Sequence, residues 1–129
     1  MAWIWIDKSI VLAIHDEQIA EHGGEAGLRD EGLLISALAR PLNKANYADI
    51  NVINLAAAYG YRIARNQPFL DGNKRTALVT MELFLILNDW ELKADDGLCL
   101  EIFIALADGS LSEKDLTSWL KANTLARTP

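Results

Sequence analysis

QPFLDGNKRT, residues 67–76, separates two segments of this chain that are almost wholly apolar. Within it, residues 71–75 place a carboxylate, a glycine, an amide and two cations in succession. Pro68 and Gly72 mark the stretch as a tight loop. Polar groups that dense between two core segments require a reason, and a phosphate accompanied by a divalent metal supplies one.

The loop contains chemical groups of the kinds that bind phosphate in proteins. Asn73 is expected to cap a helix that begins there. The backbone N–H groups of Gly72, Asn73 and Lys74 then point out of a helix N-terminus, where anions bind. Lys74 and Arg75 add positive charge, and Arg75 can hold a phosphate through two parallel hydrogen bonds. Asp71 is a hard oxygen ligand of the kind that Mg²⁺ prefers.

The same residues have a structural interpretation, in which Asn73 only caps, Asp71 pairs with Arg75, and Lys74 is solvated. Their occurrence together at the start of a buried helix favours the functional interpretation. Arg65, shortly before the loop, has two open interpretations. It either complements the C-terminus of its own helix or provides a second phosphate contact across the loop.

Capping residues and apolar patterns outside the loop predict an all-α fold of about six helices, in a single domain over residues 1–129. The helices at about 52–65 and 73–88 are apolar nearly all round, which predicts a buried hairpin with the loop at one end. The other helices are expected from Asp7 or Ser9 to about Glu21, from Asp30 to before Pro41, over about 97–107, and from Ser112 through Leu120.

Three segments are expected outside these helices. Residues 3–6 are expected to form either a short strand or an apolar arm, and residues 90–93 are expected to form a brief extended piece. Any β structure in the fold is therefore expected to be minor. Residues 41–49 are expected to form a loop or an irregular turn. In the motif itself, Phe69 is expected to anchor the loop to the core, and Pro68 to stiffen its approach.

Composition limits the function classes. The chain has 129 residues, a net charge of −6 and an isoelectric point near 4.8, which argues against direct nucleic-acid binding. Cys99 is the only cysteine and lies in an apolar run, so we expect a buried thiol in a reducing cytoplasm. The N-terminal residues lack the features of a signal peptide, and no apolar run reaches membrane-spanning length.

The chain has two histidines. We expect a structural role for His15 and an exposed side chain for His22. His15 lies beside the apolar face of the first predicted helix, which favours a hydrogen-bonded structural role over catalysis. His22 precedes a double glycine. Two histidines seven residues apart do not make a zinc site without further ligands.

The loop resembles the signature of the Fic/Doc family, H-x-F-x-(D/E/N)-(G/A)-N-(G/K)-R, and the resemblance extends from the Ile14-His15-Asp16 segment to the fourth helix. The lysine at position 74, between the asparagine and the arginine of the signature, resembles the Doc branch of the family, which consists of toxins. AMP-transferring Fic enzymes have glycine there and a second arginine where this chain has Leu78. The resemblance implies a helical fold and, by position, a target-docking flap at residues 23–30.

The chain departs from the signature at its chemical centre, because Gln67 occupies the position of the family's histidine. Histidine can take a proton from an attacking hydroxyl near neutral pH. The amide of Gln67 cannot, although it fills similar space and forms hydrogen bonds. Three explanations stay open: an engineered inactive variant, a natural member that kept only binding, or catalysis by positioning and charge stabilisation without a base.

The resemblance implies a toxin of a toxin–antitoxin module. Its active form transfers the γ-phosphoryl group of ATP, with Mg²⁺, to a serine or threonine hydroxyl of elongation factor Tu. Asp71 then holds Mg²⁺, Gly72 to Arg75 hold phosphates, and Gln67 weakens or abolishes catalysis. The alternatives are an AMP transferase of the Fic type and a catalytically silent module that binds an antitoxin or the target.

Overall fold

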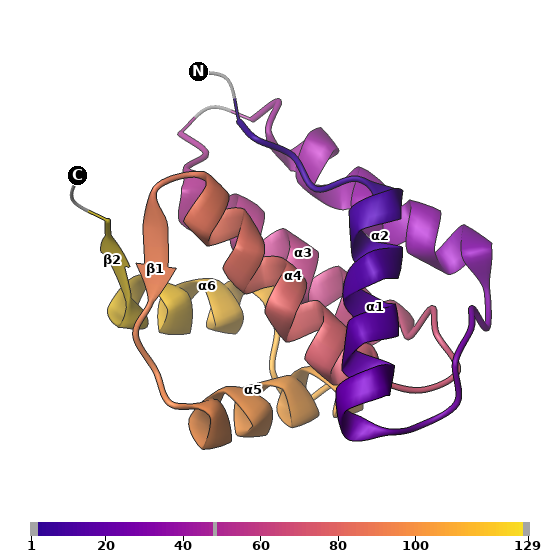
Figure 1. Cartoon of the computed structure of the whole chain (residues 1–129). Coiled ribbons are helices and arrows are strands. Elements are labelled where there is room, and N and C mark those ends of the chain that lie inside the picture. The colour runs from indigo at the N-terminus through magenta and orange to yellow at the C-terminus, as the bar shows by residue number, and fades with distance from the viewer. Residues whose placement is uncertain (1–2, 48, 128–129) are drawn as a thin grey trace.

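The computed structural model describes residues 3–47 and 49–127. Six helices and one small antiparallel sheet are present in these residues, so the predicted helical fold is confirmed. Figure 1 shows α3 and α4 at the centre, with the other helices around them. In chain order the elements are α1 (Lys8–His22), α2 (Glu31–Lys44), α3 (Val52–Asn66), α4 (Asn73–Leu87), β1 (Trp90–Leu92), α5 (Asp96–Asp108), α6 (Glu113–Asn123) and β2 (Thr124–Ala126).

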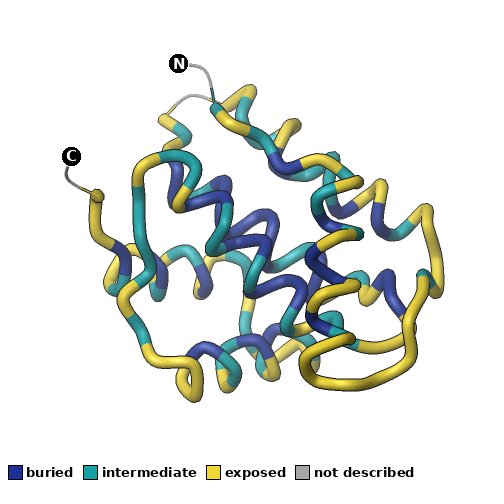
Figure 2. The backbone as a smooth tube through the Cα atoms, in the orientation of Figure 1, coloured by how far each residue is buried: buried dark blue, intermediate teal, exposed yellow. Residues whose placement is uncertain are grey.

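The predicted central hairpin is formed by α3 and α4, which pack against each other more extensively than any other pair of elements. Figure 2 shows both helices as the most deeply buried part of the chain. A side chain on Gly60 of α3 would place its Cβ 3.0 Å from Met81 Sδ and 3.1 Å from Phe103 Cζ. Glycine at this position therefore allows α3 to approach α4 and α5 closely.

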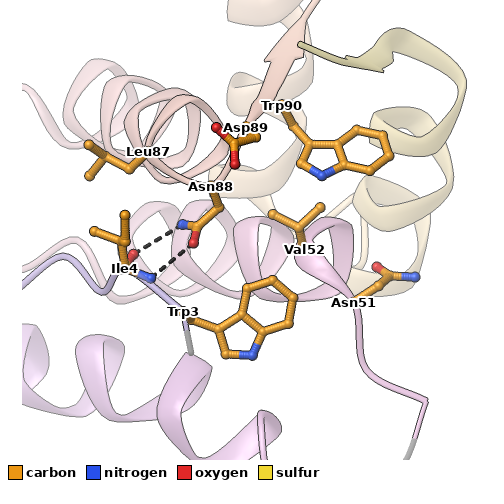
Figure 3. A pocket seen from close by; sticks show the side chains of 8 residues that line it. All are labelled: Trp3, Ile4, Asn51, Val52, Leu87, Asn88, Asp89 and Trp90. Carbon is orange, nitrogen blue, oxygen red and sulfur yellow. Dashed lines mark hydrogen bonds between the residues drawn. The ribbon is translucent and has the colours of Figure 1, made fainter. Parts of the chain in front are cut away.

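The N-terminal segment is an extended arm, not a strand, over residues 3–7. Asn88, just after α4, holds Ile4 by accepting a hydrogen bond from its N–H (2.9 Å) and donating one to its carbonyl (3.1 Å). Figure 3 shows both bonds, with Trp3 and Trp90 on either side of Val52. Ile6 is buried, and Trp3 and Trp5 pack against the core, so the arm covers part of the α3–α4 pair.

Local capping chemistry explains most helix boundaries. The predicted caps at Asp7, Asp30 and Asn51 each accept a backbone N–H of the first helical turn. Ser112 and Asp115 form the predicted capping box of α6.

The small sheet consists of β1 and β2. The predicted extended piece at residues 90–93 corresponds to β1, whereas β2 was not predicted. The two strands pair in the register Trp90↔Ala126, Glu91↔Leu125 and Leu92↔Thr124.

One helix boundary was predicted wrongly. We expected the second helix to end before Pro41, but α2 continues through it to Lys44. Pro41 is buried together with Leu34 and Ala37 on one face of α2, which packs extensively against α3. Burial of that face outweighs the hydrogen bond that a proline removes. None of the helices in the described residues is long and apolar enough to cross a membrane.

Candidate functional site

The loop between α3 and α4 borders a groove of about 540 Å³, a size typical of small-ligand sites. This loop groove lies between the end of α1, the start of α4 and one side of α5. Five residues of the sequence motif line it, Asp71, Gly72, Asn73, Lys74 and Arg75, together with Gln18, His22, Gly23, Gly24, Leu100 and Ile104.

The start of α4 differs from the prediction. Gly72, with φ 78° and ψ 16°, is the N-cap, and Asn73 is the first helical residue. The Asn73 side chain turns back instead, accepting a hydrogen bond from Phe69 N–H (2.9 Å) and donating one to Phe69 O (3.0 Å). Asn73 therefore fixes the shape of the loop and leaves the helix N-terminus without a side-chain cap.

The uncapped end of α4 presents free hydrogen-bond donors. The first backbone bond of the helix runs from Thr76 N–H to Gly72 O (3.0 Å), and within the described residues the N–H groups of residues 73–75 have no acceptor. Lys74 and Arg75 form no ion pair or side-chain hydrogen bond with any described residue. The alternative in which Arg75 only pairs with Asp71 is not observed. These donors and two cations together suit an anion.

Asp71 is held from two sides. Its Oδ2 accepts a hydrogen bond from Glu25 N–H (2.7 Å), and its backbone oxygen accepts one from His15 Nε2 (2.8 Å). No hydrogen bond from a described residue reaches Oδ1. The described residues contain no group of three or more His, Cys, Asp or Glu side chains that could hold a metal. A single carboxylate beside this helix start is compatible with Mg²⁺, which proteins often bind through one carboxylate together with phosphate oxygens and water.

The flap segment, residues 23–30, is bound along the loop. Leu28 forms an antiparallel bridge with Phe69, and Leu70 N–H donates to Gly27 O (3.1 Å). The Arg29 guanidinium donates to the carbonyls of Asn66 and Gln67, both at 2.9 Å. These bonds fix the flap segment against the end of α3, although most of its residues are exposed (Figure 2).

Two predicted site residues lie apart from the groove. Gln67 is an exposed residue at the C-terminus of α3 with left-handed backbone angles, φ 49° and ψ 58°, and it does not line the groove. Arg65 donates to Ala107 O (3.1 Å) at the end of α5 and does not line it either. Arg65 thus complements a helix C-terminus, but that of α5 and not of its own helix.

The structure adds groove residues that sequence reasoning missed. Gln18 and His22 come from α1, and Leu100 and Ile104 from α5. His22 is exposed, as predicted, and its place beside the double glycine was the only local signal. Burial of His15 (1% exposed) and its bond to Asp71 agree with the structural role predicted for it. Phe69 is buried, as expected of a core anchor.

The fold and the site together define a helical protein with a cationic, uncapped helix N-terminus at the loop of its central hairpin. Residues 5–85 match the model of the Fic/DOC family, and the chain belongs to that family. It is 30% identical over 117 residues to "Protein kinase doc" of Escherichia phage P1, covering 90% of this chain and 92% of the relative. It is also 43% identical over 75 residues to "Toxin Doc" of Mycolicibacterium smegmatis, covering 57% of this chain and 58% of the relative.

Proposed function

We propose that this chain is a Doc-like toxin of a toxin–antitoxin module, whose loop groove binds ATP with Mg²⁺. The proposed reaction is transfer of the γ-phosphoryl group to a serine or threonine hydroxyl of a translation factor, elongation factor Tu by resemblance. The proposed place of action is the cytoplasm, where an antitoxin protein would restrain it. The observation that carries the proposal is the start of α4, where N–H groups and two cations have no partner among the described residues.

Each motif residue has a proposed role in binding. The backbone N–H groups at the start of α4, from Asn73 to Arg75, hydrogen-bond phosphate oxygens, while Gly72 allows the chain to enter the helix without a side chain in the groove. Lys74 and Arg75 neutralise phosphate charge. Asp71 holds Mg²⁺ through its free carboxylate oxygen, and the metal would neutralise charge on the phosphates.

Gln67 limits the chemistry. In phosphoryl transfer the target hydroxyl oxygen bonds to the γ-phosphorus, the bond from that phosphorus to the β–γ bridging oxygen breaks, and ADP leaves. The hydroxyl proton must pass to an acceptor, and the Gln67 amide is not one. We therefore propose that binding is intact and transfer is weakened or lost.

Two alternative functions remain distinct from this proposal. A catalytically silent module that binds an antitoxin or target is favoured by Gln67, which is exposed and lacks a basic group. An AMP transferase of the Fic type is disfavoured by Leu78, which is 5% exposed and belongs to the core where such enzymes carry an arginine. Lys74 also fills the position of their glycine.

The test is Gln67→His, with Gln67→Ala as the matched control. Each protein is incubated with ATP, Mg²⁺ and elongation factor Tu, and the target is examined by mass spectrometry. We expect phosphoryl labelling with Gln67→His above both the parent and the alanine control, because a general base typically contributes about 10²–10⁴-fold. A folded, ATP-binding histidine variant without labelling would support the silent module, and an adenylyl mass would support AMP transfer.

A further inference from the structure

A second concave site lies on the other side of α3, away from the loop groove. This cationic pocket of about 680 Å³ is lined by residues of α2, α3 and α6. Figure 1 shows how these three helices lie relative to one another. The pocket shares no residue with the loop groove, which is built from α1, α4, α5 and the loops beside them. Its lining residues are Arg40, Lys44, Asn54, Tyr61, Arg62, Glu113, Lys114, Thr117, Ser118 and Lys121.

The charge of this pocket opposes that of the molecule. The chain has a net charge of −6 and only 12 Lys and Arg residues, yet five of these line the pocket beside a single carboxylate. That carboxylate, Glu113, is engaged by Lys44 (2.5 Å) and Arg40 (3.4 Å). The other three cations, Arg62, Lys114 and Lys121, form no ion pair with a described residue. The pocket therefore has positive charge left to pair with a ligand.

Two arginines of the pocket have a buried donor that is not satisfied. The Nε–H groups of Arg40 and Arg62 are buried and have no hydrogen-bond partner among the described residues. Arg62 is held over the Tyr61 ring, with its guanidinium carbon 5.6 Å from the ring centroid. Both guanidinium groups belong to residues that line the pocket, so each contributes its charge there even though its Nε is not exposed to solvent.

The spacing of the cations limits the size of the ligand. Lys114 and Lys121 are seven residues apart on α6, which corresponds to about 10 Å along the helix. When both side chains extend straight out from the helix, a ligand that contacts both must span a similar distance, which is longer than one phosphate group. An extended peptide rises about 3.3 Å per residue, so acidic side chains two to four residues apart reach both ends of the pocket. The lining also includes the neutral polar side chains of Asn54, Tyr61 and Ser118, which suit a peptide backbone.

We propose that the cationic pocket binds an acidic peptide segment of a partner protein. Nucleic acid fits less well because duplex DNA carries a charge about every 1.7 Å along its axis and would continue onto the acidic remainder of this chain. A short segment with three or four carboxylates concentrates its charge within the pocket. Binding there leaves the loop groove accessible.

The test uses a fluorescein-labelled peptide of eight residues rich in Asp and Glu, with binding followed by anisotropy at about 0.1 M salt. The variant is Lys114→Glu with Lys121→Glu, both exposed positions, so the fold should be retained. The control is Lys93→Glu with Arg127→Glu, which changes the net charge equally at exposed positions outside the pocket. We expect the pocket variant to lose at least about tenfold in affinity and the control less than about twofold.

Four results would overturn the proposal. The parent could fail to bind the peptide, or the control could lose as much affinity as the pocket variant, which would indicate non-specific attraction. A DNA oligonucleotide of the same charge could bind more tightly through the same two lysines, which would make the pocket a nucleic-acid site. Inorganic phosphate could displace the peptide at equal concentration, which would make it a small-anion site.

Discussion

The rings of His15 and Phe69 stack with their centroids 3.8 Å apart and an angle of 7° between their planes. The His15 ring also forms a hydrogen bond, through Nε2, to the backbone oxygen of Asp71. Because a carbonyl only accepts, Nε2 carries a hydrogen and donates this bond. One side chain of α1 therefore fixes two positions of the α3–α4 loop, one in the core and one at the groove.

His15→Ala should remove both contacts and leave a cavity beside Phe69. We expect a loss of about 2–5 kcal/mol in the free energy of unfolding, as for other large buried side chains, measured by urea denaturation. His15→Phe is the matched variant, because it retains the stack and loses only the hydrogen bond to Asp71. It should cost about 1 kcal/mol. If both variants are as stable as the parent, the stack does not hold the loop.

Asp71→Asn and Asp71→Ala should separate metal binding from loop structure. Asparagine keeps an oxygen that can accept from Glu25 N–H, whereas alanine loses that bond as well. Both variants should lose the Mg²⁺-dependent part of ATP affinity, since neither has a carboxylate. Alanine alone should loosen the flap segment, seen as faster hydrogen exchange at the Glu25 amide. Unchanged Mg²⁺ dependence in both would make Asp71 a structural residue.

Local patterns predicted most of this fold because its helix starts depend on neighbouring residues. Asp30, Asn51 and Ser112 each cap the turn that follows them in sequence. Pro41 shows where that approach fails, since burial against α3 is a tertiary effect that no local signal carries. β2 was missed for the same reason, because its partner β1 lies more than thirty residues earlier in the chain.

The site was predicted in part. The contiguous residues 71–75 do line one groove, since a run at a helix start needs no distant information. The prediction for Asn73 was wrong, because its side chain bonds the backbone of Phe69 and does not cap α4. Whether residue 72 or residue 73 becomes the N-cap depends on the shape of the loop, which local sequence does not reveal. Gln18 and Ile104 come from helices distant in sequence, and nothing in their own surroundings indicates a groove.

Cys99 should make the protein less stable at alkaline pH. The thiol is buried, and burial, with the nearby Glu82, Asp96 and Asp95 charges, raises its pKa from 9.0 to about 11. The folded state therefore keeps the proton when the unfolded state has begun to lose it. Stability from this source is present below pH 9 and is lost as the pH rises toward about 11.

Cys99→Ala tests this effect by comparison of pH dependence. Urea denaturation at pH 8 and pH 10 should show a smaller decrease in the free energy of unfolding for the variant than for the parent. The pKa of buried Tyr59 is also raised, by burial first, but that contribution is common to both proteins and cancels in the comparison. Parallel pH profiles would show that the thiol is not protected from ionisation in the folded state.

Arg75→Ala and Lys74→Ala should lower ATP affinity to different extents. A guanidinium binds two phosphate oxygens at once, whereas an ammonium acts as a point charge, so Arg75→Ala should have the larger effect. Hydrogen bonds to charged groups contribute about 1.5–3 kcal/mol, which corresponds to roughly ten- to hundredfold in affinity for Arg75→Ala. Neither side chain has a partner among the described residues, so the melting temperature should change little.

Calorimetric titration with ATP and Mg²⁺ measures these affinities, with Lys93→Ala as the control for loss of an exposed cation outside the groove. Combining Lys74→Ala with Arg75→Ala should leave weak binding, because the free N–H groups at the start of α4 belong to the backbone and survive both changes. That residual affinity should fall little with added salt compared with the parent, since the side-chain charges are gone. Full parental affinity in both single variants would place the nucleotide elsewhere, and target or antitoxin binding would then account better for the loop.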